Sequence, residues 1–187
     1  DTKDGGGGTS QPGKRSNVFI SWRMSECKEE VKALRQALEA KAVETVVIGE
    51  LPGGDLLEAV TNGMKAADLF VILGSKTYGR KTSGMIDTYQ EMQRIKASKK
   101  PFFLINLNPK ESAMQFEEES TNLLFPLSTT AFERWEIATP MPERLAEKIM
   151  AKLKASSTAG DSKRRHACVE GTPSNRDGEG GSARKTR

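Results

Sequence analysis

Short apolar runs alternate along the chain with segments in which apolar residues recur at helical spacing. The runs cover residues 18–20, 45–48, 69–73 and 102–105. Runs that are apolar throughout are typical of parallel strands covered on both faces. A weaker pattern predicts a short helix over residues 112–119 and a fifth strand over 125–127. Strands that alternate with helices in this way predict an α/β domain with a parallel sheet.

The segments between the runs predict helices with capping residues at their starts. We expect Ser25 to cap the first helix, and Asp55, with Glu58 three residues later, to cap the second. The third helix is expected over residues 85–97, and Pro142 opens the last. The buried stripes of the first, second and last helices are expected to be Cys27, Val31, Leu34 and Leu38, then Leu57, Val60 and Met64, and then Leu145, Ile149 and Leu153.

The net charge of the chain lies in its two ends. Lys and Arg number 29 against 25 Asp and Glu, a formal net charge of +4. Residues 1–16 carry +1 and residues 155–187 carry +3, so residues 17–154 are neutral. Both ends are polar and rich in glycine, which predicts disordered tails around one domain at 17–154. A neutral domain gives no electrostatic reason to expect nucleic acid as a partner.

The composition of the domain excludes several kinds of chemistry. The only histidine, His166, lies in the C-terminal segment, which argues against Ser-His-Asp and Cys-His nucleophiles and against most zinc and iron sites. We therefore expect no metal and no cofactor. Cys27 and Cys168 have no metal spacing and suit a reducing compartment. No apolar run approaches the roughly 20 residues needed to span a bilayer, and no signal peptide is evident, so a cytoplasmic location is expected.

Residues 74–82 are a possible phosphate-binding loop, because they follow a strand and precede a helix. However, Arg80 separates Gly79 from Lys81, although the motif needs glycine next to lysine. The fourth strand also ends in Asn106 instead of a carboxylate for magnesium. This pattern therefore disfavours a nucleoside-triphosphate site.

Glu91 is the main candidate for chemistry. At about 100° per residue it falls about 40° beyond Ile95, at the edge of the buried stripe of its helix, with Asp87 one turn earlier. Such a carboxylate can face the ligand cleft of an α/β sheet, where desolvation and Asp87 would raise its pKa; the alternative is a solvated boundary residue. Trp22 and Arg23 follow the first strand and suit ligand binding, although the Trp ring could simply pack on a helix.

Residues 17–23, Asn-Val-Phe-Ile-Ser-Trp-Arg, resemble the first-strand motif of Toll/interleukin-1 receptor (TIR) domains. Further matches follow in the order of that family. They are a Gly/Pro loop at 49–54, Gly-x-x-x-Ala-Asp at 63–68 before an apolar strand, residues 75–78, the helix bearing Glu91, residues 100–104, and a last helix after Trp135 and Pro140. The resemblance covers residues 17–154, the whole neutral segment.

This resemblance implies a flavodoxin-like, five-stranded parallel sheet flanked by helices. It implies binding to other TIR domains, and in many members it implies hydrolysis or cyclisation of NAD+ by cleavage of the nicotinamide–ribose bond. Glu91 matches the essential glutamate of those members. Nicotinamide is already a cationic leaving group and needs no acid, so one carboxylate suffices to stabilise the oxocarbenium-like ribosyl centre or to act as the nucleophile.

The resemblance also implies where the partners bind. NAD+ or NADP+ would contact Ser21, Trp22, Arg23, Gly53 and Tyr78, and a protein interface would use Glu50, Leu51, Pro52, Gly54 and Asp55. One departure is that Asp87 stands where many active members carry Trp, four residues before the glutamate. Tyr78, Tyr89 or Trp22 would then have to supply the aromatic surface, or catalysis is weak or lost. The alternatives are therefore a non-catalytic TIR module that signals by homotypic binding and, more distantly, a flavodoxin-like nucleotide-binding domain of another family.

Overall fold

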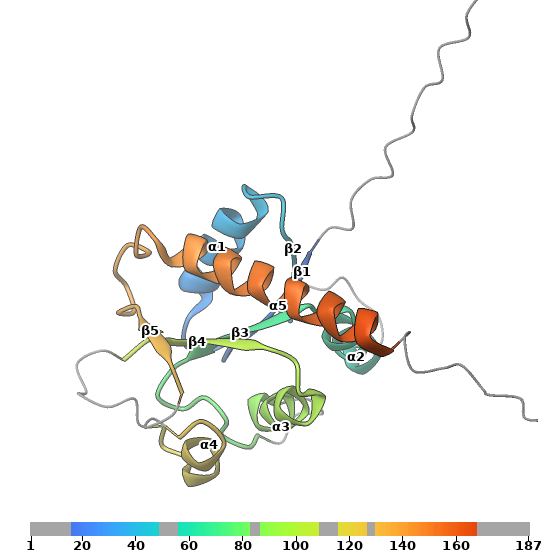
Figure 1. The fold of residues 1–187 in the computed structure, drawn as a ribbon. Helices are drawn as coiled ribbons and strands as arrows, with labels where there is room; N and C mark the ends of the chain where they lie inside the picture. The colour runs from blue at the N-terminus through green and yellow to red at the C-terminus, as the bar shows by residue number, and fades with distance from the viewer. Residues whose placement is uncertain (1–15, 49–55, 83–86, 109–115, 127–129, 168–187) are drawn as a thin grey trace, which may run out of the picture.

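A five-stranded parallel sheet forms the centre of the protein, with the strand order β2-β1-β3-β4-β5 (Figure 1). The computed structural model describes residues 16–48, 56–82, 87–108, 116–126 and 130–167. The strands are β1 (Asn17–Ser21), β2 (Glu44–Val47), β3 (Leu69–Gly74), β4 (Phe102–Asn106) and β5 (Phe132–Arg134). This confirms the predicted flavodoxin-like α/β fold.

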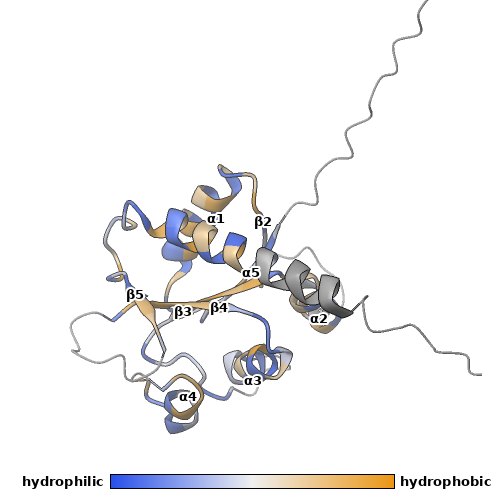
Figure 2. Cartoon of the chain, in the orientation of Figure 1, coloured by the Kyte–Doolittle hydropathy of each residue, from blue (hydrophilic) through white to orange (hydrophobic). Residues whose placement is uncertain are grey.

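Helices cover both faces of the sheet. They are α1 (Lys28–Glu39), α2 (Leu56–Ala66), α3 (Thr88–Ser98), α4 (Glu119–Leu124) and α5 (Leu145–Ala167). The helices α1 and α5 pack on one face, and α2, α3 and the segment around α4 pack on the other (Figure 1). Figure 2 shows apolar strands in the middle and helices that carry both polar and apolar residues. Burial on both faces explains why every residue of β3 is buried.

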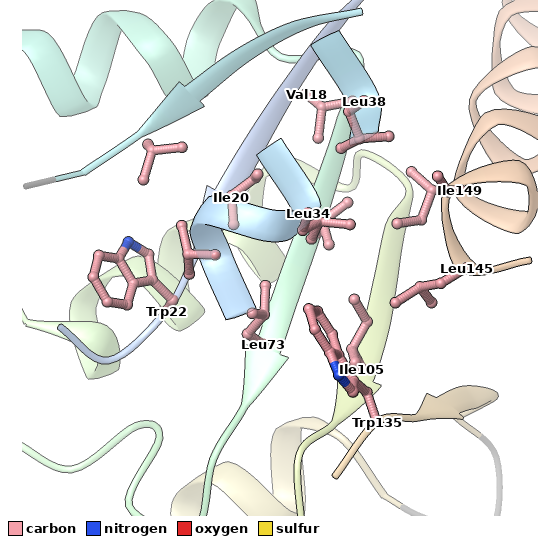
Figure 3. Close-up of a cluster of buried hydrophobic side chains, with 14 of the residues drawn as sticks. Val18, Ile20, Trp22, Leu34, Leu38, Leu73, Ile105, Trp135, Leu145 and Ile149 are labelled. Carbon is pink, nitrogen blue, oxygen red and sulfur yellow. The ribbon is translucent and has the colours of Figure 1, made fainter. Parts of the chain in front are cut away.

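The core under α1 and α5 contains both tryptophans (Figure 3). Leu34 of α1 and Ile149 of α5 pack there against the apolar side chains of the strands. Trp135 follows β5 directly, and its indole N–H donates a hydrogen bond of 3.1 Å to the carbonyl oxygen of Thr139. Trp22 follows β1, so this core reaches the carboxyl end of the sheet.

The helix α2 lies close to the sheet because of Gly63 and Lys100. A Cβ atom at Gly63 would lie 2.7 Å from Val46 Cγ1, so only glycine allows this approach. The ammonium group of Lys100 donates hydrogen bonds of 3.2, 2.6 and 2.8 Å to the carbonyl oxygens of Met64, Lys65 and Ala67. These carbonyls at the helix end lack intrahelical partners, so Lys100 joins α2 to the start of β4.

The structure corrects the predictions for residues 108–141. The fifth strand is Phe132–Arg134 and not 125–127. Phe125 is fully buried and packs against the rings of Phe102 and Phe116, with centroids 5.3 and 6.4 Å away. The short helix is Glu119–Leu124; residues 116–118 of the predicted range 112–119 are not helical, and 112–115 lie outside the described residues. The apolar side chain of Phe125 therefore packs in the core and does not belong to a strand.

Several helix ends also differ from the prediction. The helix α1 is capped at Cys27 and not at Ser25, with no side-chain hydrogen bond at the cap. The helix α3 begins at Thr88 because the side chain of Asp87 caps it. Leu57 is 37% exposed, so it is not part of the buried stripe of α2. The helix α5 runs to Ala167, so it continues into the segment predicted as the C-terminal tail.

Candidate active site

A cleft of about 230 Å³ opens at the carboxyl ends of β1 and β2. One wall comes from residues 22–25 after β1 together with Ile48 after β2. The other lining residues are Thr82, together with Asp87, Thr88 and Glu91 at the start of α3. Ligands of open α/β sheets bind in this position, so the cleft lies where the sequence predicts it.

A larger hollow of about 490 Å³ is lined by residues of α2 and α3 together with Phe70 and Lys100. None of the residues that line it is a carboxylate. The smaller cleft holds the carboxylates and the aromatic ring that sequence reasoning selects, and is therefore the candidate active site despite its size. Within the described ranges, no three His, Cys, Asp or Glu side chains come together as a metal site requires.

Glu91 lines the cleft and is only 4% exposed. The hydroxyl of Ser21 donates a hydrogen bond of 2.6 Å to its Oε2 atom. Burial is the main reason why the pKa of Glu91 is raised to about 7. The hydrogen bond from Ser21 lowers the pKa, the Asp87 carboxylate raises it further, and Arg94 lowers it. The alternative of a solvated boundary residue does not hold. At neutral pH the carboxyl group is divided between its protonated and ionised forms.

Ser21 and Tyr78 lie behind Glu91 and not on the cleft wall that the described residues form. Both are fully buried, and the Tyr78 hydroxyl lies 2.6 Å from Ser21 Oγ. The Tyr78 ring belongs to the core, with its centroid 6.0 Å from that of Phe116. Burial also raises the pKa of Tyr78, so the phenol keeps its proton. Among the described residues neither side chain lines the cleft, and contact of Ser21 or Tyr78 with a nucleotide stays a prediction.

Trp22 both packs in the core and lines the cleft. It is 6% exposed, and its indole N–H donates a hydrogen bond of 3.1 Å to the carbonyl oxygen of Ile48. Arg23 lines the same wall. Its Nη1 atom lies 3.4 Å from the carbonyl oxygens of Thr77 and Arg80, so the guanidinium holds the chain after β3 in place. Trp22 therefore packs in the core and also lines the cleft, while its contact with a ligand stays a prediction.

Asp87 caps α3 with its side chain. Its carboxylate accepts hydrogen bonds from the backbone N–H groups of Thr82, at 3.0 Å, and Gln90, at 2.9 Å. Tyr89 does not line the cleft and instead has the Lys81 ammonium 4.4 Å from its ring centroid. Among the described residues, Trp22 is therefore the one aromatic side chain on the cleft wall.

Some lining residues are absent from the sequence-based prediction, and some predicted residues cannot be placed. The lining residues that were not singled out are Met24, Ser25, Ile48, Thr82 and Thr88; Met24, Ser25 and Thr82 follow strands at the sheet edge where ligands are expected. Gly53 and the predicted interface residues Glu50, Leu51, Pro52, Gly54 and Asp55 lie outside the described residues. No helix in the described parts of the chain has the length and apolar content needed to cross a membrane.

An open parallel sheet in the order β2-β1-β3-β4-β5, with helices on both faces, defines a flavodoxin-like α/β domain. The model of the TIR domain family matches residues 18–123. The chain therefore belongs to the TIR domain family.

Several solved structures are similar to this chain. The CMP N-glycosidase BcmB of Clostridium botulinum is 16% identical, with a TM-score of 0.45, over 73% of this chain and 99% of that chain. The TIR domains of the activated Roq1 resistosome, which recognises the pathogen effector XopQ, are 17% identical, with a TM-score of 0.45, over 78% and 84%. A cysteine-to-alanine mutant of flavodoxin from Pseudomonas aeruginosa is 18% identical, with a TM-score of 0.41, over 76% and 97%. No curated protein matches the chain.

The raised pKa of Glu91 should make stability depend on pH. Its pKa of about 7 lies above the ordinary value of 4.5, so the folded protein holds the proton more tightly than the unfolded chain. The contribution of Glu91 to stability is then fully present below about pH 4.5 and is lost as the pH rises through 7. Relative to Glu91→Gln, the wild type should lose roughly 2 kcal/mol of unfolding free energy between pH 5 and pH 7. Urea unfolding of both proteins across this range measures the difference, and a constant difference would contradict the assignment.

Proposed function

We propose that this TIR domain cleaves the bond between nicotinamide and ribose in NAD+ or NADP+, with Glu91 as the catalytic carboxylate. The observation that carries the proposal is the burial of Glu91 at a cleft, with a pKa of about 7. A carboxylate whose pKa is raised by burial destabilises the fold when it is ionised. Such a group in a cleft at the carboxyl ends of parallel strands is typical of a functional site.

The reaction needs only one ionised carboxylate. The C–N bond breaks with its electron pair moving to the nicotinamide nitrogen, so nicotinamide leaves as a neutral molecule. The ribosyl carbon becomes oxocarbenium-like, and the Glu91 carboxylate stabilises it or forms a bond to it. Attack by water then gives ADP-ribose and releases one proton, whereas attack by a nitrogen of the adenine ring gives a cyclic product. Histidine and metal are not needed for any of these steps.

The cleft suits the nicotinamide end of the dinucleotide. At about 230 Å³ it is smaller than the roughly 300–1,000 Å³ of pockets that enclose whole ligands. The indole edge of Trp22 offers an apolar wall for the nicotinamide ring. The guanidinium of Arg23 is suited to a phosphate. The rest of the dinucleotide would extend beyond these residues, and association with other TIR domains would supply the remaining contacts.

The second candidate function is a non-catalytic TIR module that signals by binding other TIR domains. The observation in its favour is Asp87, which stands in place of the tryptophan of many active members and acts as a helix cap. Under both functions we place the protein in the cytoplasm as a signalling component. The two functions differ in whether nicotinamide is released.

Nicotinamide release from NAD+ should rise with pH, with a midpoint at about 7, because only the ionised form of Glu91 is active. Concentrated, assembled protein is incubated with NAD+ between about pH 5.5 and 8.5, and nicotinamide is measured by chromatography. A rate that falls as the pH rises through 7 would contradict the role given to the carboxylate. The absence of nicotinamide under conditions that assemble the protein would favour the homotypic binding module instead.

A further inference from the structure

We propose that Ser21 and Tyr78 act as positioning residues for Glu91, through a hydrogen-bonded chain that holds Oε2 from behind and leaves Oε1 for the substrate. The proposal rests on the cleavage reaction proposed above and deepens it. The chain runs from the Tyr78 hydroxyl through the Ser21 hydroxyl to the Glu91 carboxylate. In this role both hydroxyls act on the nucleotide only through Glu91.

The three groups come from three separate parts of the fold. Ser21 is the last residue of β1, Tyr78 lies between β3 and α3, and Glu91 is in the first turn of α3. Both links measure 2.6 Å between oxygens, which is short for hydroxyl hydrogen bonds. Ser21 and Tyr78 are fully buried, and Glu91 is nearly so. Water therefore does not replace either link.

The direction of the chain follows from the number of hydrogens. Ser21 has a single hydroxyl proton, which it donates to Oε2 of Glu91. Tyr78 must then donate its own proton to Ser21 Oγ, since the phenol stays protonated in its buried position. Hydrogen bonds that point the same way polarise one another in a low-dielectric interior. The chain therefore favours the ionised carboxylate and directs a bound proton to Oε1, the oxygen that remains for the cleft.

The backbone fixes Tyr78 independently of Glu91. Its backbone N–H donates to the carbonyl oxygen of Ser75 at 3.1 Å, and its own carbonyl oxygen accepts from the Thr121 hydroxyl at 3.4 Å. The next residue, Gly79, donates its N–H to the Thr88 hydroxyl at 3.0 Å. Because these contacts tie Tyr78 to both α3 and α4, the chain is preorganised before a ligand binds.

Other ionisable groups also act on Glu91, and the test must separate them from the chain. Asp87, which caps α3, raises the pKa of Glu91, and Arg94 of α3 lowers it. Arg23 also lines the cleft. Cys27 is the smallest of the causes that act on the pKa of Tyr78. Burial raises the pKa of the Cys27 thiol itself to about 12, so the thiol carries no charge near neutral pH. None of these groups changes when a hydroxyl of the chain is removed.

The test follows the protonation of Glu91 directly, by carbon-13 NMR of its side-chain carboxyl group, assigned with the Glu91→Gln variant. Ser21→Ala removes the hydrogen bond that stabilises the ionised Glu91 carboxylate, so the titration midpoint of Glu91 should rise by about one pH unit from its wild-type value. Tyr78→Phe keeps the ring packed and should raise the midpoint by a smaller but measurable amount. The pH profile of kcat should move in parallel, with little change in KM.

Ser75→Ala is the matched control. It removes another buried hydroxyl directly after β3, one that has no hydrogen-bond partner among the described residues, and should leave the midpoint unchanged. The proposal is overturned if the titration midpoint of Glu91 is unchanged in both Ser21→Ala and Tyr78→Phe. It is also overturned if Ser75→Ala shifts that midpoint as much as these two variants do. If Ser21→Ala does not fold, Tyr78→Phe decides alone. The NMR titration needs no turnover, so the chain can be upheld even if NAD+ is not cleaved, and cleavage can be upheld if the midpoints do not move.

Discussion

Glu91→Gln should lower the rate of nicotinamide release about a hundredfold or more while the protein stays folded. Glutamine has the shape of glutamate, and its oxygen can still accept the hydrogen bond from Ser21. It carries no negative charge, so it neither stabilises an oxocarbenium-like centre nor forms a covalent intermediate with the ribose. Release of nicotinamide from saturating NAD+ at about pH 8, where the wild-type carboxylate is ionised, measures the loss.

Two controls separate this loss of activity from damage to the fold. The variant should be more stable than the wild type at about pH 8, because it removes a buried charge. Glu30→Gln makes the same chemical change at another buried carboxylate, which lies on α1 and accepts a hydrogen bond of 2.8 Å from the Ala138 N–H. That variant should keep its activity. A Glu91→Gln protein that is folded and fully active would refute the catalytic assignment.

Gly79→Ala should lower the free energy of unfolding by about 3 kcal/mol. Gly79 has a φ of 84°, a conformation that residues with a Cβ atom rarely adopt. A Cβ atom there would also lie 2.0 Å from the hydroxyl oxygen of Thr121, which is fully buried and cannot move into solvent. Backbone strain and overpacking therefore act together. Chemical denaturation of the variant and the wild type measures the effect.

A double mutant separates the two causes. In a Thr121→Ala background the hydroxyl and methyl groups are gone, so Gly79→Ala should cost about half as much, because the backbone strain and only the milder contact with the Cβ atom of residue 121, at 3.1 Å, remain. An undiminished cost in that background would mean that the contact with Thr121 is unimportant. Gly79 follows Tyr78 directly, so we also expect the single variant to disturb the hydrogen bond between Tyr78 and Ser21.

The parallel sheet could be predicted from sequence because its central strands are buried on both faces, which leaves continuous apolar runs. Residues 69–73 are such a run and lie in β3, all of whose residues are buried. The edge strand β5 could not be predicted in this way. Phe132–Arg134 has one apolar residue and is only partly buried, whereas the stronger apolar pattern at 125–127 contributes Phe125 to the core below α4.

The sequence by itself determined the α/β fold, the position of the cleft at the strand ends and the choice of Glu91 as the candidate carboxylate. These follow from local periodicity and from the family's motifs. Only the tertiary structure decided that Ser21 and Tyr78 stand behind Glu91, while Trp22 reaches the cleft wall. Ser21 lies 70 positions from Glu91 along the chain. Desolvation and hydrogen bonding depend on such distant groups, so the pKa of Glu91 becomes defined only when β1, β3 and α3 pack together.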